Sequence, residues 1–330
     1  MKQQSDKEAS AVKKPIRQNW LDRTKFRLDT WQQKHRFIAF PYAVIKKYSD
    51  DEAGYQAALV TYYGFLSLFP LLIVATAVIQ AVSQRNDAMR EQFIASINSY
   101  FPAIGQSLTD SINTPTKTGV ALVLALLVAF YGARGVAEAV QHALNHAWAV
   151  PRHKRTGFPW SPLRSLAMIF CAGVGLIIAA SFTGWATSGT HEWWIRFTLW
   201  LTGFTFLFLV FWGVFTFGSS ARKRPFSNIP GAFFAALGIL LLQAVGSYII
   251  TRQLKTFTGL NAQFAIVLVI MFWMYLQAQV LLYAIEFTSV RSLRLWPRSL
   301  DNKPPTIADR KAYELYRERE TFHVDKPVGH

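Results

Sequence analysis

Residues 256–285, TFTGLNAQFAIVLVIMFWMYLQAQVLLYAI, run for 30 residues without an Asp, Glu, Lys or Arg. Apolar side chains lie on every side of this stretch, whereas a strand of a membrane barrel alternates between polar and apolar residues. A helix crosses the hydrocarbon core of a bilayer with about 20 apolar residues. The stretch therefore predicts a transmembrane α-helix.

Charge is absent from five more runs of the 330-residue chain, at 57–81, 118–133, 165–190, 197–221 and 225–251. Four of them are long enough to span a bilayer, and the second, at 16 residues, must draw in the charged sequence that follows it. We predict an all-α, polytopic membrane protein with six transmembrane helices in a domain over residues 49–290.

The composition excludes other classes of protein. Charged residues make up 16% of the chain, against about 25% in soluble domains, and none lies in the six runs, which excludes a water-soluble fold. The single cysteine, Cys171, lies inside the third run, so it provides neither a disulfide framework nor a cysteine-based metal site. No short apolar core with a cleavage site precedes the first run, so we expect that run to act as an uncleaved insertion signal.

Positive charge is distributed unevenly between the segments that flank the spans. The two terminal segments and the loops 134–164 and 222–224 hold 29 Lys and Arg residues, and the three alternate loops hold 6. Because cytoplasmic loops carry such an excess, we expect both termini in the cytoplasm. The net charge of +16 then faces an anionic leaflet, with about 1 kcal/mol of attraction per basic residue. We expect membrane lipids as partners, with anionic lipid at the cytoplasmic face, and no nucleic acid.

Three segments outside the spans carry patterns of their own. Residues 1–48 are basic and mix aromatic residues with cations, which is typical of an amphipathic helix on a membrane surface. Residues 82–117 carry apolar residues at helical spacing, which predicts an external amphipathic helix that rests on the lipid or caps the bundle. The cytoplasmic tail, 291–330, holds a mixed-charge stretch at 309–320 for which we expect a solvated helix.

A polar stripe follows the short second run. Arg134, Glu138, His142 and His146 recur every four residues, so they share one face of a helix near the inner boundary of the membrane. Arg134 and Glu138 are spaced for an i,i+4 ion pair. One interpretation is a proton or anion relay that opens into a cytoplasmic vestibule; the other is a helix that leaves the membrane with its polar face in water. We expect no metal site, because no fourth ligand is identifiable.

Polar residues also occur inside the later spans. Glu286 ends the longest apolar run, where it either reaches water or pairs with a cation such as Arg291 or Arg134. Gln243 and Gln277 lie well inside their spans, where amides hydrogen-bond between helices or line a pathway.

In the first span, Ser67 and Pro70 interrupt an otherwise regular helix. Such an interruption predicts either a break that binds an ion or a simple kink. Together with the polar residues above, they complete a candidate pathway or vestibule: Arg134, Glu138, His142, Glu286, Gln243, Gln277, Ser67 and Pro70.

Four short motifs follow one another along the chain: AALVTYYGFLSLFPLL at 57–72, ALNHAW at 143–148, Pro230-Gly231-Ala232, and LLYAIE at 281–286. In this order, over roughly residues 40–290, the chain resembles the YihY/BrkB family of bacterial inner-membrane proteins. The resemblance implies a multi-pass inner-membrane protein of a family linked to serum resistance and to transport of lipid or envelope precursors. The ribonuclease label that the family once carried is regarded as a misassignment.

Two functions from different classes fit these observations. A secondary transporter, or a translocator of lipid or envelope precursors, requires an internal polar cavity and a vestibule around Arg134, Glu138 and Glu286. A non-transporting scaffold requires only a dry bundle and basic termini that bind partners or anionic lipid. A membrane-embedded enzyme has only the weak His142 and His146 pair to support it, so we expect no enzyme. No phosphate-binding loop of the Walker type is present, and we expect no cofactor.

Overall fold

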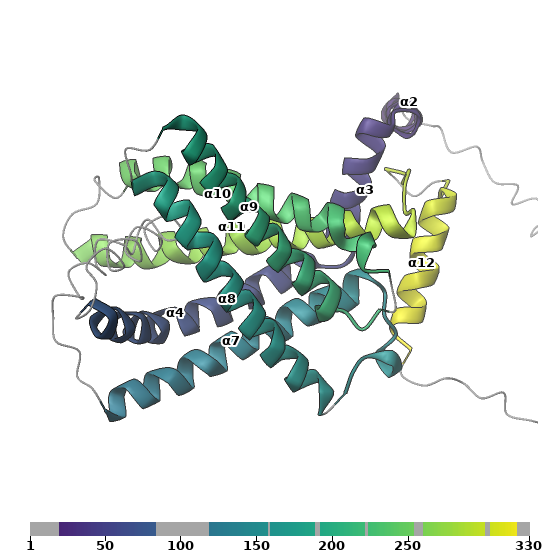
Figure 1. Cartoon of the computed structure of the whole chain (residues 1–330). Coiled ribbons are helices and arrows are strands. Elements are labelled where there is room, and N and C mark those ends of the chain that lie inside the picture. Colours follow the sequence, from purple (N-terminus) through teal and green to yellow (C-terminus); the bar gives the residue numbers. More distant parts are fainter. Residues whose placement is uncertain are drawn as a thin grey trace, which may run out of the picture.

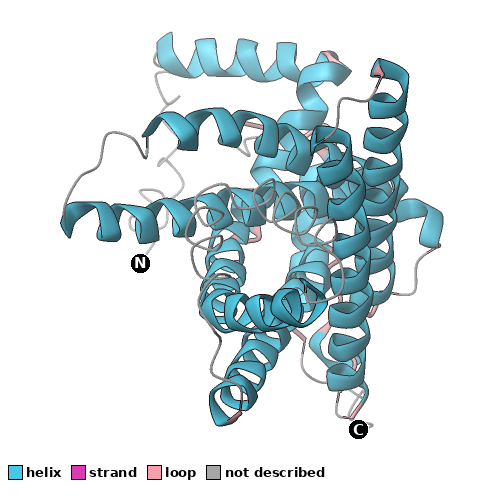
Figure 2. Ribbon diagram, turned by 60° about the vertical axis from the view of Figure 1, so that its left-hand side comes forward, coloured by secondary structure: helices cyan, strands magenta, loops and turns pink. Residues whose placement is uncertain are grey.

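The structure is a computed structural model that describes residues 20–83, 119–157, 159–188, 192–221, 224–253, 260–300 and 304–321. Within these ranges the chain consists of helices joined by short loops and contains no strand (Figure 2). The α-helices are α2 (Trp20–Lys34), α3 (Arg36–Asp50), α4 (Ala53–Ser83), α7 (Val120–Ala147), α8 (Trp160–Ser188), α9 (Trp193–Gly218), α10 (Ile229–Gln253), α11 (Leu260–Leu293) and α12 (Ile307–Arg319). Two short 3-10 helices, η1 (Arg152–Lys154) and η2 (Pro225–Asn228), lie in loops.

Six of the described helices, α4 and α7 to α11, are long and apolar enough to cross a membrane. They overlap the six charge-free runs, so the prediction of an all-α fold with six spans is confirmed. α7 continues past Arg134 to Ala147, and the short second run reaches spanning length in this way. Residues 84–118, which hold most of the predicted external helix, lie outside the described residues.

The spans pack as a series of neighbouring pairs. α4 packs against α7 and α11, α10 lies between α9 and α11, and α8 lies along α9. In Figure 1, α8 and α9 cross the other spans steeply, side by side. A Cβ on Gly231 of α10 would lie 1.6 Å from Thr288 Oγ1 and 2.7 Å from the carbonyl oxygen of Ala284, both on α11. Glycine therefore sets how closely these two helices approach.

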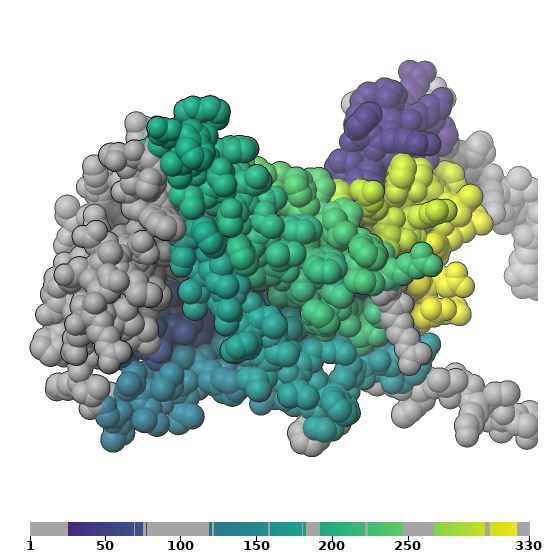
Figure 3. Space-filling view, viewed as in Figure 1, coloured from purple at the N-terminus to yellow at the C-terminus, as the bar shows by residue number. Residues whose placement is uncertain are grey.

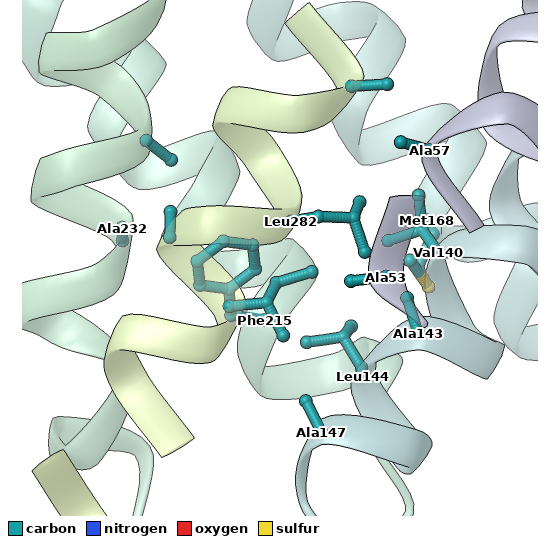
Figure 4. Close-up of a cluster of buried hydrophobic side chains, with 14 residues drawn as sticks. Ala53, Ala57, Val140, Ala143, Leu144, Ala147, Met168, Phe215, Ala232 and Leu282 are labelled. Atoms are coloured by element: carbon teal, nitrogen blue, oxygen red, sulfur yellow. The ribbon is translucent and has the colours of Figure 1, made fainter. Parts of the chain in front are cut away.

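A hydrophobic core lies at the centre of the bundle and receives residues from all six spans, α4 and α7 to α11 (Figure 4). Leu144, Phe215 and Leu282 are each 1% exposed, and alanines such as Ala53 and Ala143 let the helices come close around them. Elsewhere large apolar side chains point outward, as residues that face lipid do.

Both ends of the described chain fold onto the same end of the spans. α3 packs against α11, and its Ala43 and Val44 share a buried cluster with Ala312 of α12. The purple and yellow residues that meet on one side of Figure 3 belong to these two terminal segments. We call this end of the bundle, where α3 and α12 pack, the terminal end.

The terminal segments differ in part from expectation. A helix does form at the mixed-charge stretch 309–320, as α12, but Ala308 and Ala312 are buried, so the expectation of full solvation is wrong on that face. The described part of segment 1–48 is helical, as α2 and most of α3. α3 ends at Asp50 and α11 ends at Leu293, close to the predicted domain boundaries at 48 and 290. The division into three domains stays a prediction.

α4 is a continuous helix from Ala53 to Ser83, with Pro70 inside it. Of the two alternatives expected at Ser67 and Pro70, the structure rules out the break, and a helix that continues past Pro70 is compatible with the simple kink. The hydroxyl of Ser67 donates a hydrogen bond of 2.8 Å to the carbonyl oxygen of Gly64, one turn back. Transmembrane helices tolerate proline where neighbouring helices and hydroxyl side chains compensate for the lost backbone bond.

Candidate functional site

Four charged side chains meet at the terminal end, where the spans give way to the terminal helices. Lys47 Nζ lies 3.0 Å from Glu286 Oε2 and also pairs with the carboxylate of Asp51. Arg319 Nη1 donates a 2.8 Å hydrogen bond to Asp51 Oδ1. Lys47 and Asp51 are each 1% exposed and Glu286 is 2% exposed. We call Lys47, Asp51, Glu286 and Arg319 the buried charge network.

The network joins segments that are far apart in the sequence. Lys47 lies on the last turn of α3, and Asp51 follows four residues later in the link to α4. Glu286 belongs to α11, and Arg319 ends α12. His146, at the end of α7, borders the network, with Nδ1 3.2 Å from Arg319 Nη1 and 3.9 Å from Asp51 Oδ1. The site thus connects both terminal segments to the ends of three spans, α4, α7 and α11.

The charges of the network balance, with two cations facing two carboxylates. Burial alone lowers the pKa of Lys47, but the carboxylates of Glu286 and Asp51 outweigh it and raise that pKa above its usual value. Burial raises the pKa of Asp51, but the cations of Lys47 and Arg319 outweigh it and hold that pKa below its usual value. Both groups are therefore charged at neutral pH. Because an unpaired buried charge is costly, each member of the network requires the others.

A second polar cluster lies beside the network and holds α12 in place. Arg298 is fully buried, with Nε 2.8 Å from Asp309 Oδ1 and Nη2 3.0 Å from Asp50 Oδ2. Asp309 also accepts hydrogen bonds from the backbone N–H groups of Ser299 and Thr306, at 2.9 and 3.0 Å. Burial raises the pKa of Asp309, but Arg298 and these bonds outweigh it and hold that pKa below its usual range. The cluster fixes the loop between α11 and α12.

Glu286 forms an ion pair, one of the outcomes expected from the sequence, but its partner differs. The cation is Lys47 of α3, and not Arg291 or Arg134, which were the examples named from the sequence. Lys47 reaches Glu286 because α3 folds back onto α11. Arg134 and Glu138 form the predicted i,i+4 pair, at 2.8 Å. That pair is about half exposed. Their part in a vestibule stays a prediction.

His142 lies one turn before His146, and the two imidazole rings stack with centroids 5.8 Å apart. His142 is exposed, whereas His146 is partly covered by the network. The polar stripe on α7 thus passes from an exposed ion pair to the edge of the buried charge network. The stripe reaches the network at His146, a residue outside the candidate pathway defined from the sequence.

Gln243 and Gln277 lie on α10 and α11, two spans that pack against each other. Gly246 of α10 lies against Trp273 of α11. Gln243 is three residues from Gly246 and Gln277 is four residues from Trp273, so the two glutamines lie at similar depths along the packed helices. The Nε2 atoms of both are buried without a hydrogen-bond partner among the described residues. Among the described residues these nitrogens thus form no interhelical hydrogen bond, one of the two roles expected for the glutamines, and the other role, lining a pathway, stays a prediction.

Sequence reasoning missed Lys47, Asp51 and Arg319. A local signal existed for two of them, since Lys47 and Asp51 stand four residues apart immediately before the first span. Arg319 gave no such signal, because it lies in the tail and reaches the network only through the packing of α12. Tertiary structure brings Arg319 and Glu286 to the local pair of Lys47 and Asp51.

These features define a polytopic α-helical membrane protein whose terminal segments fold onto one end of the bundle and share buried charges with it. A sequence profile of the family described as Virulence factor BrkB matches residues 44–306, most of the chain, and the protein belongs to this family. The matched range contains Lys47, Asp51 and Glu286, whereas Arg319 lies beyond it.

Relatives of known sequence agree with this assignment. The chain is 23% identical over 271 residues to the ribonuclease-like protein YfkH of Bacillus subtilis, covering 77% of this chain and 95% of YfkH. It is 25% identical over 289 residues to the inner membrane protein YhjD of Escherichia coli, covering 81% and 85%. It is also 25% identical over 296 residues to a UPF0761 membrane protein of Stenotrophomonas maltophilia, covering 85% and 67%. No solved structure matches the chain. The protein is an integral membrane protein of an inner-membrane family.

Proposed function

We propose that the protein is a secondary transporter that translocates a lipid or another envelope precursor across the inner membrane. The observation that carries the proposal is the buried charge network, which joins both terminal segments to α7 and α11. In this proposal the network is the closed cytoplasmic gate of the bundle. The terminal segments and the loops on their side hold 29 Lys and Arg residues, against 6 in the other loops. This excess supports a cytoplasmic position for both termini and thus for the gate.

Physical chemistry favours a gate over a purely structural role for the network. Buried ion pairs contribute little net stability compared with well-packed apolar residues, so stability alone does not explain four buried charges. Ionisable residues of membrane proteins at or within the span typically belong to pathways or switches. A network with members on separate elements opens if those elements separate, which is the movement that alternating access requires.

Two further observations support an amphiphilic substrate. The unpaired amide nitrogens of Gln243 and Gln277 offer hydrogen-bond donors inside the spans. The spans also expose aromatic side chains along α9 and α10, among them Phe217 and Phe234, which suit acyl chains. The proposal involves no catalytic step, no cofactor and no nucleic acid.

Lipid translocation in proteoliposomes tests the proposal. Purified protein is reconstituted with a fluorescent phospholipid, and dithionite is added outside to quench the accessible leaflet. With the protein present, we expect dithionite to quench a larger fraction of the fluorescent lipid, and to quench it faster, than in protein-free vesicles. We expect this with or without an imposed pH gradient. Quenching equal to that of empty vesicles under both conditions would contradict lipid translocation and favour the alternative below.

A membrane scaffold is the second candidate, and one observation favours it. α2 and the start of α3 expose Phe26, Trp31 and Phe37 next to cations such as Arg27 and Arg36, a surface suited to anionic lipid. Deletion of residues 1–34 separates the two candidates. A scaffold loses its association with anionic vesicles, whereas a transporter keeps its translocation activity.

A further inference from the structure

A groove of about 460 Å³ opens on the outer surface of the bundle, between α9 and α10 near the terminal end. Phe204 and Phe208 form its α9 wall, one helical turn apart, and Ile229 and Phe233 form its α10 wall with the same spacing. The rings of Phe204 and Phe233 meet edge to face, with centroids 5.6 Å apart. This contact gives the groove a packed aromatic floor.

One charged residue lines the groove. Arg291 lies in the last turn of α11, and the other lining residues are uncharged. The Arg291 side chain is exposed, and none of the described residues forms an ion pair with it. The groove therefore combines an apolar trough with a guanidinium at its terminal end.

We propose that this groove binds one anionic glycerophospholipid, with an acyl chain along the phenylalanine rings and the phosphate on Arg291. The groove lies on helices that are apolar enough to cross a membrane, and Arg291 lies in the last turn of α11, where the proposal places the headgroup, so both parts of a lipid meet matching chemistry. An anionic headgroup complements an unpaired guanidinium, and the cytoplasmic leaflet, which the excess of Lys and Arg places at this end, is rich in anionic lipid.

A lipid fits this groove better than a peptide segment does. A peptide segment in an open, lipid-facing groove would bring backbone N–H and C=O groups into hydrocarbon without partners. A lipid carries its polar groups only at the headgroup, where Arg291 lies. The site does not depend on transport, because a tightly held lipid is compatible with either a transporter or a scaffold.

Native mass spectrometry of the intact protein tests the site. The protein is taken from nanodiscs of phosphatidylethanolamine and phosphatidylglycerol, and the lipid that stays bound is identified. We expect wild type to retain one phosphatidylglycerol. Arg291→Gln should lower that retention about tenfold, since a charge-assisted hydrogen bond contributes roughly 1.5–3 kcal/mol.

Two further variants make the test specific. Arg294→Gln removes the same charge three residues further on, from an exposed position that does not line the groove, and it should retain lipid as wild type does. Thr205→Trp fills the groove while Arg291 stays, and it should lose the bound lipid. Equal losses in Arg291→Gln and Arg294→Gln would overturn the site in favour of diffuse surface attraction. Unchanged retention in Arg291→Gln or in Thr205→Trp would overturn it as well.

Discussion

Lys47 and Glu286 show how two residues that are each unfavourable inside a protein become acceptable together. Each is almost completely buried, and each is neutralised by the other across 3.0 Å. Asp51 and Arg319 form a second neutral pair within the same network. Removal of one member leaves a net charge in a buried site, whereas removal of a matched pair leaves none.

A double-mutant cycle tests this balance. Lys47→Met and Glu286→Leu should each lower the free energy of unfolding by about 3–5 kcal/mol, because each leaves an uncompensated buried charge. The combination of both substitutions should lie within about 1 kcal/mol of wild type. The measurement is denaturant or thermal unfolding of the purified protein in detergent. Additive losses in the double variant would show that the two side chains do not compensate each other.

Asp309 makes the stability of the terminal end depend on acid. Its folded-state pKa lies below the unfolded value of about 3.9, so its contribution is fully present above about pH 4 and is lost as the pH falls further. Asp309→Asn should cost about 3 kcal/mol at neutral pH, because Arg298 loses its charged partner. The variant should also lose less stability than wild type below about pH 4.

The matched control for this pH dependence is Glu314→Gln, an exposed acid on the same helix. Unfolding curves of the three proteins are compared from neutral pH down to about pH 3. Parallel curves for wild type and Asp309→Asn would refute the assigned role of Asp309.

For the helices, the sequence predicted well which segments form spans, but it predicted poorly which helices pack against each other. Runs such as 256–285 are free of charge along their whole length, and this local property is sufficient to define a span. The network depends instead on α3 folding onto α11 and on α12 reaching α3, and no local pattern records such contacts. Glu286 was recognised because it ends the longest charge-free run, whereas the contacts of Lys47 and Arg319 with other helices leave no trace in the local sequence.

The α10–α11 contact gives the motif Pro230-Gly231-Ala232 a physical role. Gly231→Ala places a methyl group against Thr288 and the backbone of Ala284, so it should cost about 1–3 kcal/mol of stability through overpacking. Gly173→Ala on α8 is the control, because no described atom lies within 4 Å of its added Cβ. Thermal unfolding in detergent should show a loss for the first variant and no loss for the second. Equal behaviour would mean that the close approach of α10 and α11 does not depend on glycine.

At the scale of the whole molecule, the two terminal segments and the spans form one structure. α3 and α12, which flank the six spans in sequence, meet at the terminal end and share charges with α7 and α11. A change at this end therefore acts on the bundle as well as on the termini. In the proposed function, the buried charge network closes the bundle on the side that the excess of Lys and Arg assigns to the cytoplasm.

Thiol accessibility at one position inside the spans shows whether the network closes the bundle. Cys171, which is exposed on α8, is replaced by serine, and a single cysteine is placed at Gln277. Inverted membrane vesicles are then treated with a membrane-impermeant maleimide, with the network intact or carrying Lys47→Met. Loss of Lys47 leaves a buried carboxylate unpaired at a cost of several kcal/mol, so the proposed gate should open more often, and we predict labelling at least about tenfold faster in the Lys47→Met background. Equal labelling rates with and without Lys47 would contradict the claim that the network is the gate.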